Sequence, residues 1–71
     1  MYDYTLLKQK LVEKRITQTQ AGAMVGMSPA LISLKLNGGR DFKQSEMLAL
    51  CRLLDIPMKK IDSYFFTLEV R

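Results

Sequence analysis

Residues 18–38 read QTQAGAMVGMSPALISLKLNG, and this run carries two helix starts on either side of one glycine. Thr17 and Gln20 have the spacing of a capping box, in which a hydroxyl and a side-chain amide bond the free N–H groups of a first helical turn. Gly26 follows where a helix end needs a left-handed residue, and Ser28-Pro29 supplies an N-cap and a first-turn proline. The pattern therefore predicts two short helices joined by a tight turn.

Apolar residues mark the inner faces of these two helices. The first is expected to run through Val25, with Ala21, Met24 and Val25 turned inward. The second is expected over Pro29–Leu36, where Ile32 and Leu36 lie four residues apart on one side. Asn37-Gly38-Gly39 ends it with residues that tolerate a positive φ angle.

The rest of the chain predicts three more helices around one loop, residues 38–43. A helix over 4–16 has its apolar face at Tyr4, Leu7, Leu11 and Ile16, with Asp3 or Thr5 as its cap. The clearest amphipathic pattern, at i, i+3, i+4 and i+7, is Met47, Leu50, Cys51 and Leu54, and it stops at Asp55-Ile56-Pro57. A short fifth helix contains Met58, Ile61, Tyr64 and Phe65. We expect Met24, Met47 and Met58 to pack in the core. The tail alternates as in a half-buried strand, with Phe66, Leu68 and Val70 on one side.

Composition excludes several classes of protein. The 71 residues carry a net charge of +4, one cysteine and no histidine. Cys51 has no partner for an internal disulfide, and no Cys/His zinc site is available. Apolar stretches end well short of the roughly 20 residues that a bilayer requires, and nothing resembles a signal peptide. We expect one cytoplasmic domain that is not an enzyme and has no metal, cofactor, membrane or small-molecule partner, because no catalytic constellation appears.

The run over 18–38 resembles the helix-turn-helix of the phage Cro and repressor (Cro/C1-type) family. The matching features are the opening Gln18, the small residue Gly22, the turn glycine Gly26, the inward Ile32 and the closing Leu36-Asn37-Gly38. Residues 53–65 resemble the end of the same fold. The resemblance implies a five-helix all-α domain over residues 1–71, with the helix-turn-helix at about 18–36 and a short, β-like tail at about 66–71. The family more often has Ala in place of Gly22, and glycine loosens a helix by roughly 0.5–1 kcal/mol.

The resemblance also places the candidate binding residues. In this family the second helix of the motif enters the major groove, and its N-terminal residues face the base edges. Carried over, those residues are Ser28, Pro29, Ala30, Ser33 and Leu34, with Lys35 at the far end. None of the first five can make the bidentate bonds by which Arg, Lys, Asn or Gln discriminates bases. Phosphate contacts are expected from Gln18, Thr19, Lys35, Asn37, Arg40 and Lys43.

Two functions follow from the resemblance, both in a bacterial host cell. The first is a Cro-like regulator of a phage lysis/lysogeny switch, which opposes the phage repressor by binding operator DNA, as a monomer or a homodimer. The alternative is an antirepressor of the kind called a modulator of repression, which binds the DNA-binding domain of the phage repressor. In that alternative the contact surface is an apolar patch of Met27, Pro29, Ala30 and Leu34 flanked by Lys35 and Arg40.

Overall fold

Five α-helices make up most of residues 2–69, the part of the chain that the computed structural model describes. They are α1 (Thr5–Glu13), α2 (Gln18–Met24), α3 (Pro29–Leu36), α4 (Gln44–Leu53) and α5 (Ile61–Phe65), with a 3-10 turn, η1 (Met58–Lys60), before α5. No strand forms within the described residues, so the predicted all-α class is confirmed. None of the described helices is long and apolar enough to cross a membrane.

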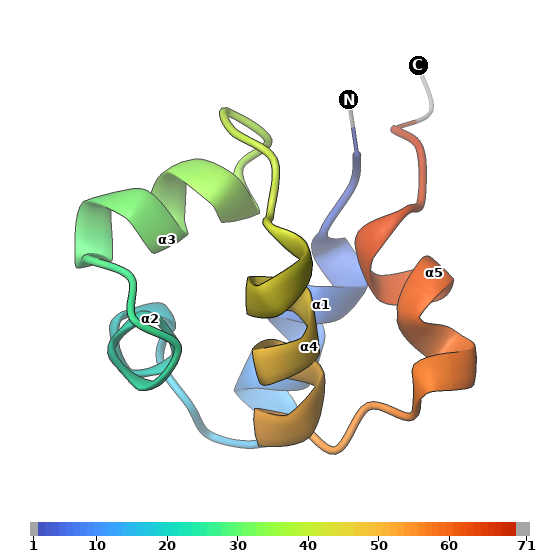
Figure 1. Ribbon diagram of the computed structural model, residues 1–71, viewed down its shortest axis with the longest axis horizontal. Coiled ribbons are helices and arrows are strands. Elements are labelled where there is room, and N and C mark those ends of the chain that lie inside the picture. Colours follow the sequence, from blue (N-terminus) through green and yellow to red (C-terminus); the bar gives the residue numbers. More distant parts are fainter. Residues whose placement is uncertain (1, 70–71) are drawn as a thin grey trace.

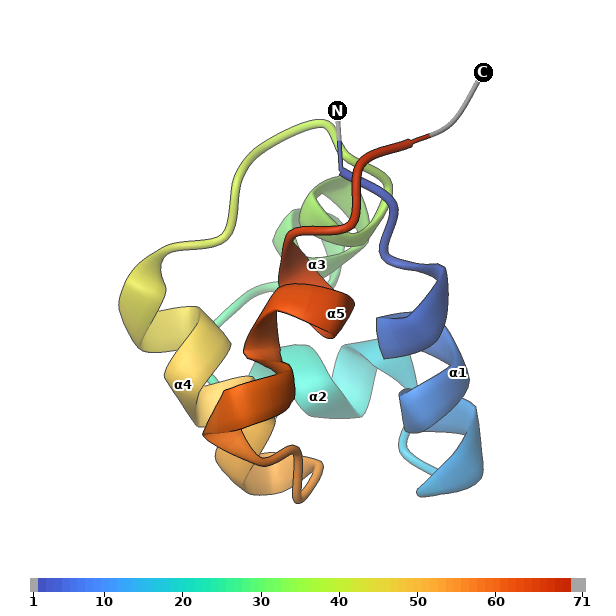
Figure 2. The same cartoon turned by 90° about the vertical axis from the view of Figure 1, so that its right-hand side faces the viewer.

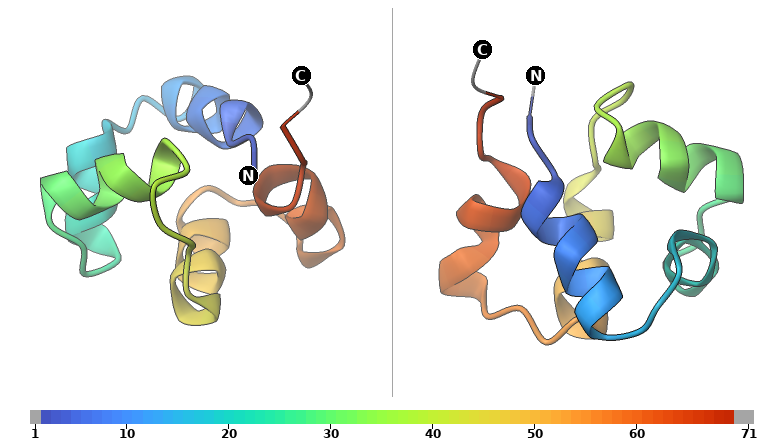
Figure 3. Two further views of the ribbon diagram at one scale, coloured as in Figure 1. Left: turned by 90° about the horizontal axis from the view of Figure 1, so that it is seen from above. Right: turned by 180° about the vertical axis from the view of Figure 1, so that it is seen from behind.

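The helices surround one core. Seen from above, α1 and α4 lie opposite each other, with α2 and α3 at one end and η1 and α5 at the other (Figure 3). α2 packs mainly against α3, and α1 against α5. Figure 2 shows α5 in front, between α1 and α4. The α2 and α3 pair therefore projects from one end of the molecule, where α3 has a free outer side (Figure 1).

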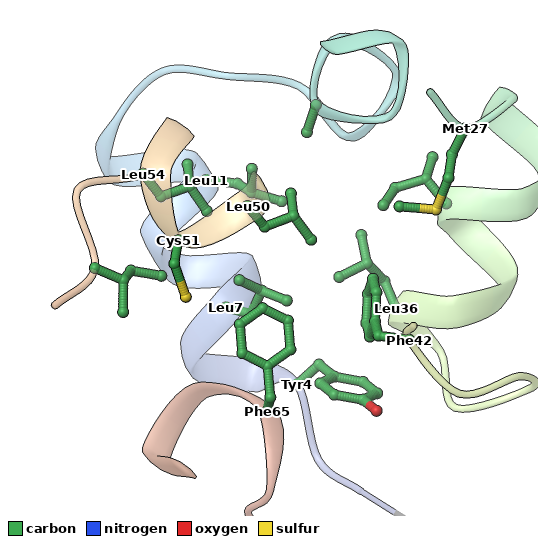
Figure 4. Close-up of a cluster of buried hydrophobic side chains, with 13 residues drawn as sticks. Tyr4, Leu7, Leu11, Met27, Leu36, Phe42, Leu50, Cys51, Leu54 and Phe65 are labelled. Carbon is green, nitrogen blue, oxygen red and sulfur yellow. The ribbon is translucent and has the colours of Figure 1, made fainter. Parts of the chain in front are cut away.

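Buried apolar side chains from every helix meet between α1, α4 and this pair (Figure 4). The core consists of Tyr4, Leu7, Leu11, Ala21, Met27, Ile32, Leu36, Phe42, Leu50, Cys51, Leu54, Ile56 and Phe65. The inward faces predicted for the first and fourth helices are confirmed, with Ile16 and Met47 partly buried against the core. Each fully buried leucine contributes roughly 1.5–3 kcal/mol to folding.

Two methionines expected in the core are on the surface. Met24 is 66% exposed and Met58 is 50% exposed. α2 turns Ala21 and Gly22 inward, and Met24 lies about 200° around the helix axis from Gly22. Met58 begins η1, which buries none of its residues. Both predictions were wrong because a helix this short does not define its inner face by apolar residues alone.

Four helices end in the same hydrogen-bonded pattern, the Schellman motif. In each, an N–H group beyond the helix donates to a carbonyl five residues earlier: Ile16 to Leu11, Met27 to Gly22, Gly39 to Leu34 and Ile56 to Cys51, at 2.7–2.9 Å. The preceding residues, Arg15, Gly26, Gly38 and Asp55, all have positive φ angles of 55–82°. Gly26 and Gly38 were predicted to end helices. The first helix ends at Glu13, before the expected Ile16, because Arg15 adopts the left-handed conformation.

The tail packs back on the N-terminal segment. Leu68 forms an isolated antiparallel bridge with Tyr2, and the N–H of Asp3 donates to the carbonyl of Thr67 at 2.7 Å. The ring of Phe66 meets that of Tyr2 edge to face. This single bridge is what the predicted β-like tail becomes among the described residues, and Val70, which was assigned to the same alternation, lies outside them.

The left-handed residues of these Schellman motifs lead us to expect opposite effects on stability from two substitutions. Arg15→Gly should raise the free energy of unfolding by about 0.5–1 kcal/mol, because glycine adopts a left-handed φ angle without the clash of a Cβ atom. Gly26→Ala should lower it by about 1 kcal/mol for the same reason. No atom lies within 4 Å of a Cβ placed at Gly26, so the loss comes from the positive φ angle and not from a clash with another residue. Urea unfolding followed by circular dichroism measures both, and a stability gain from Gly26→Ala would contradict the argument.

Candidate functional site

The candidate site is built on residues 17–37, here called the α2–α3 unit, which contains both helices and the turn between them. The predicted capping box is present: the N–H of Gln20 donates to the Thr17 hydroxyl at 3.1 Å, and the N–H of Thr17 donates to the Gln20 side chain at 2.9 Å. The hydroxyl of Ser28 accepts from the N–H of Leu31 at 3.2 Å. These local bonds set where α2 and α3 begin.

Gly22 allows α2 and α3 to pack closely. A Cβ atom on Gly22 would lie 2.9 Å from Cγ2 of Ile32 and 3.0 Å from the carbonyl oxygen of Met27. Both distances are shorter than ordinary van der Waals contact. The Cro/C1-type family more often has Ala at this position, but the close packing of α2 and α3 in this chain requires Gly22. The loss of helix propensity at Gly22 is offset by the contact that its missing side chain permits.

The outer face of α3 is formed by small and apolar side chains. Ala30, Ser33 and Leu34 have the i, i+3, i+4 spacing of one helical face, and all three are exposed, as are Ser28 and Pro29 at the start of the helix. Leu34 is 43% exposed. Part of its side chain packs over Gly39, where a Cβ atom would clash with Leu34 Cδ1. The five residues expected to face a partner therefore lie together on a neutral surface.

Lys35 does not belong to that surface, contrary to the sequence prediction. Its side chain is 2% exposed, and its Nζ lies 2.5 Å from Oε1 of Glu46 on α4. Residue 35 follows Ile32 by three positions, about 60° around the helix axis, so it lies next to Ile32 on the inward side. Lys35 is therefore not available to contact a phosphate or to flank a partner surface.

Glu46 joins this ion pair to the start of α4. The same Oε1 atom accepts from the N–H of Lys43 at 2.8 Å. Burial raises the pKa of the Glu46 carboxyl, but the hydrogen bonds from Lys35 and from the Lys43 backbone outweigh burial and hold that pKa below its ordinary value. The carboxylate thus stabilises the fold in its charged form, and it connects α3 to α4.

Met27 is also absent from the exposed patch in which it was expected. It is 4% exposed and lies in the core (Figure 4). Met27 occupies the position just after the left-handed Gly26, where a residue that follows a Schellman motif commonly packs back on its helix. The patch is reduced to Pro29, Ala30 and Leu34.

The other candidate residues lie in or next to the α2–α3 unit and differ in their exposure and in their hydrogen bonds. Gln18 begins α2 and is half-buried, whereas Thr19 is exposed. Asn37 is exposed but engaged: its Nδ2 donates to the carbonyl of Ser33 at 2.9 Å, and its Oδ1 accepts from Lys8 Nζ at 3.1 Å. Arg40 and Lys43 are exposed in the loop between α3 and α4.

The net positive charge is not on the α2–α3 unit. Lys35 is the one charged residue among positions 17–37, and it is buried. Exposed cations lie outside this unit: Arg40 and Lys43 in the loop after α3, Arg52 in the last turn of α4, and Lys59 and Lys60 in η1. η1 lies at the opposite end of the molecule from α3 (Figure 1). The α2–α3 unit, which resembles a DNA-binding helix-turn-helix, thus exposes no formally charged side chain.

Comparisons with known proteins agree with a full-length relationship. A family model described as "Protein of unknown function (DUF739)" matches residues 1–68. The solution structure of the modulator of repression (MOR) of the temperate bacteriophage TP901-1 from Lactococcus lactis is similar, with 36% sequence identity and a TM-score of 0.78. That match covers 99% of this chain and 95% of the MOR chain. The search of curated proteins gives no match.

The buried ion pair makes stability depend on acid pH. Because the folded-state pKa of Glu46 is lowered, its contribution is fully present above the ordinary value of 4.5 and is lost as the pH falls through the lowered pKa. Glu46→Gln keeps an acceptor for the Lys43 N–H but leaves Lys35 buried and unpaired. It should lower the free energy of unfolding at pH 7 by about 3 kcal/mol and flatten the acid dependence.

Urea unfolding between pH 3 and pH 7 tests this expectation. Lys35→Met combined with Glu46→Gln is the matched double variant, since it removes both charges and should be more stable than Glu46→Gln alone. Equal stability of Glu46→Gln and the native chain at pH 7 would show that the pair contributes nothing.

Proposed function

The chain belongs to the DUF739 family, and we propose that it regulates the lysis–lysogeny switch of a temperate phage by opposing repression. The proposal is supported by the similarity to the TP901-1 modulator of repression over nearly the full length of both chains. We propose a binding role rather than an enzymatic one, because the similar protein of known structure is described as a modulator of repression.

We further propose that the chain acts as an antirepressor, whose α3 outer face covers the DNA-binding domain of the phage repressor. One observation carries this choice between the two functions expected from sequence: the α2–α3 unit exposes no charged side chain. Affinity for DNA comes largely from Lys and Arg side chains that neutralise phosphates, and the burial of Lys35 leaves this unit without any. A protein interface, by contrast, is depleted of charge at its centre.

The composition of the outer face agrees with this choice. Pro29, Ala30 and Leu34 offer apolar area, and Ser33 offers a hydroxyl, whereas base discrimination needs bidentate donors and acceptors. Asn37, the amide residue that directly follows α3, is bonded to Ser33 and Lys8. A second protein can bury these side chains without leaving a charge unpaired.

Calorimetry with the purified DNA-binding domain of the repressor encoded in the same phage genome tests the proposal. The native chain should bind it, and Leu34→Glu and Ala30→Glu should each weaken binding at least tenfold, which is about 1.4 kcal/mol. Both place an unpaired charge in the centre of the proposed interface. Val12→Glu is the matched control, because Val12 is an exposed apolar residue on α1, and it should leave the affinity unchanged.

A gel-shift titration with the intergenic DNA of the switch tests the alternative function, operator binding. The native chain should not shift this DNA at micromolar concentration in low salt. A shift that weakens steeply with added salt and is lost in Ala30→Glu, together with no heat of binding to the repressor domain, would overturn the antirepressor proposal in favour of operator binding.

A further inference from the structure

Aromatic side chains from both ends of the chain gather around one cavity. The sequence has six aromatic residues, and five of them line a hollow of about 190 Å³. The lining residues are Tyr2, Tyr4, Phe42, Phe65 and Phe66, together with Met47 and Asp41. We call this hollow the aromatic cavity. The sequence places Tyr4 in the first helix, Phe65 in the fifth helix and Phe66 in the tail, and it predicts no cavity between them.

The rings form two groups, one buried at the bottom of the cavity and one at its solvent side. Tyr4, Phe42 and Phe65 are buried and pack edge to face, with ring centroids 5.1 Å apart for Tyr4 and Phe42 and 5.4 Å for Phe42 and Phe65 (Figure 4). Tyr2 and Phe66 stand at the solvent side, 5.7 Å apart, and Phe66 is 45% exposed. Tyr2 and Phe66 are thus accessible to a group that enters from outside.

Asp41 adds a negative charge to this ring of aromatic groups. It is exposed, and within residues 2–69 it takes part in no ion pair. Burial raises the pKa of the Tyr4 hydroxyl, and the charges of Asp41 and Tyr2 raise it further, as expected for groups that share one cavity. Aromatic rings and an unpaired carboxylate both attract a cation.

We infer that the aromatic cavity binds the guanidinium group of an arginine from a partner protein. A planar guanidinium stacks on aromatic rings and donates two parallel hydrogen bonds to a carboxylate, which the compact ammonium of lysine cannot do. The size is suitable, because an engineered cavity of roughly 150 Å³ holds a benzene molecule. The fit is therefore to one planar side-chain end.

The source of the arginine rests on the proposed function. A DNA-binding domain carries arginines on the surface that meets phosphates and bases. Asp41 and Phe42 lie in the loop that leads from α3 to α4 (Figure 1), so this loop connects the helix of the proposed interface to the edge of the cavity. Capture of an arginine there supplies the charge complementarity that the neutral face of α3 lacks.

Titration of the ¹⁵N-labelled full chain with N-acetyl-arginine methylamide, followed by NMR, tests the cavity itself. The shifts should saturate and should be largest at residues 2–4, 41–42 and 65–66. The citrulline analogue, which has the same shape without the charge, should bind at least fivefold more weakly. Asp41→Asn should weaken the arginine compound to the same degree, and Phe66→Ala should also weaken it.

Asp55→Asn is the control, because it removes an exposed carboxylate away from the cavity, one that is paired with Lys14, and it should leave the binding of the arginine compound unchanged. Equal binding of the citrulline analogue, or of the arginine compound to Asp41→Asn, overturns the inference.

Calorimetry with the repressor domain separates the inference from the function on which it rests. Asp41→Asn should weaken that complex about tenfold. If the repressor domain binds and Asp41→Asn leaves the affinity unchanged, the arginine site is wrong and the antirepressor function stands. If the arginine compound saturates the cavity while the repressor domain does not bind, the site stands and the antirepressor function is wrong.

Discussion

The ion pair between Lys35 and Glu46 sets the orientation of α3, and the surface proposed for function depends on it. Two charges with 2% and 12% exposed side chains are stable only when each is paired, and Glu46 is further bonded to the N–H of Lys43. Because the bond crosses from α3 to the first turn of α4, it opposes rotation of α3. Ile32 and Leu36 are buried on the inward side of α3, and Ala30, Ser33 and Leu34 face solvent.

Local sequence signals were sufficient to predict where the helices of the α2–α3 unit begin and end. Thr17, Gln20, Ser28 and Gly26 act through bonds to residues no more than five positions away, so their effect is readable from spacing. The left-handed conformation of Arg15 was not readable in this way. An arginine has no preference for that conformation, and the end of α1 is fixed by tertiary packing of Ile16 and Leu11.

The errors at the candidate site have a common origin in nonlocal contacts. A lysine near a helix C-terminus normally points into water, and the partner that draws Lys35 inward lies on another helix. Met24 is exposed because the requirement for Gly22 at the helix crossing sets which side of α2 is buried, and Met27 is buried because the chain packs back on α2 after the left-handed Gly26. The aromatic cavity was missed since its residues come from both termini and from the loop after α3, and each alone has an ordinary core role.

The neutral face of α3 and the aromatic cavity supply different parts of recognition. Apolar area on Pro29, Ala30 and Leu34 is non-directional and discriminates poorly between partners. A guanidinium site with Asp41 at its edge is directional, because stacking and paired hydrogen bonds fix both position and angle. A partner that presents an arginine beside an apolar groove can occupy the aromatic cavity and cover the apolar face of α3 at the same time. A DNA duplex has no cationic group to place in the cavity. The neutral face that makes α3 unsuited to base recognition, together with the aromatic cavity, therefore suits the chain to a DNA-binding protein as its partner.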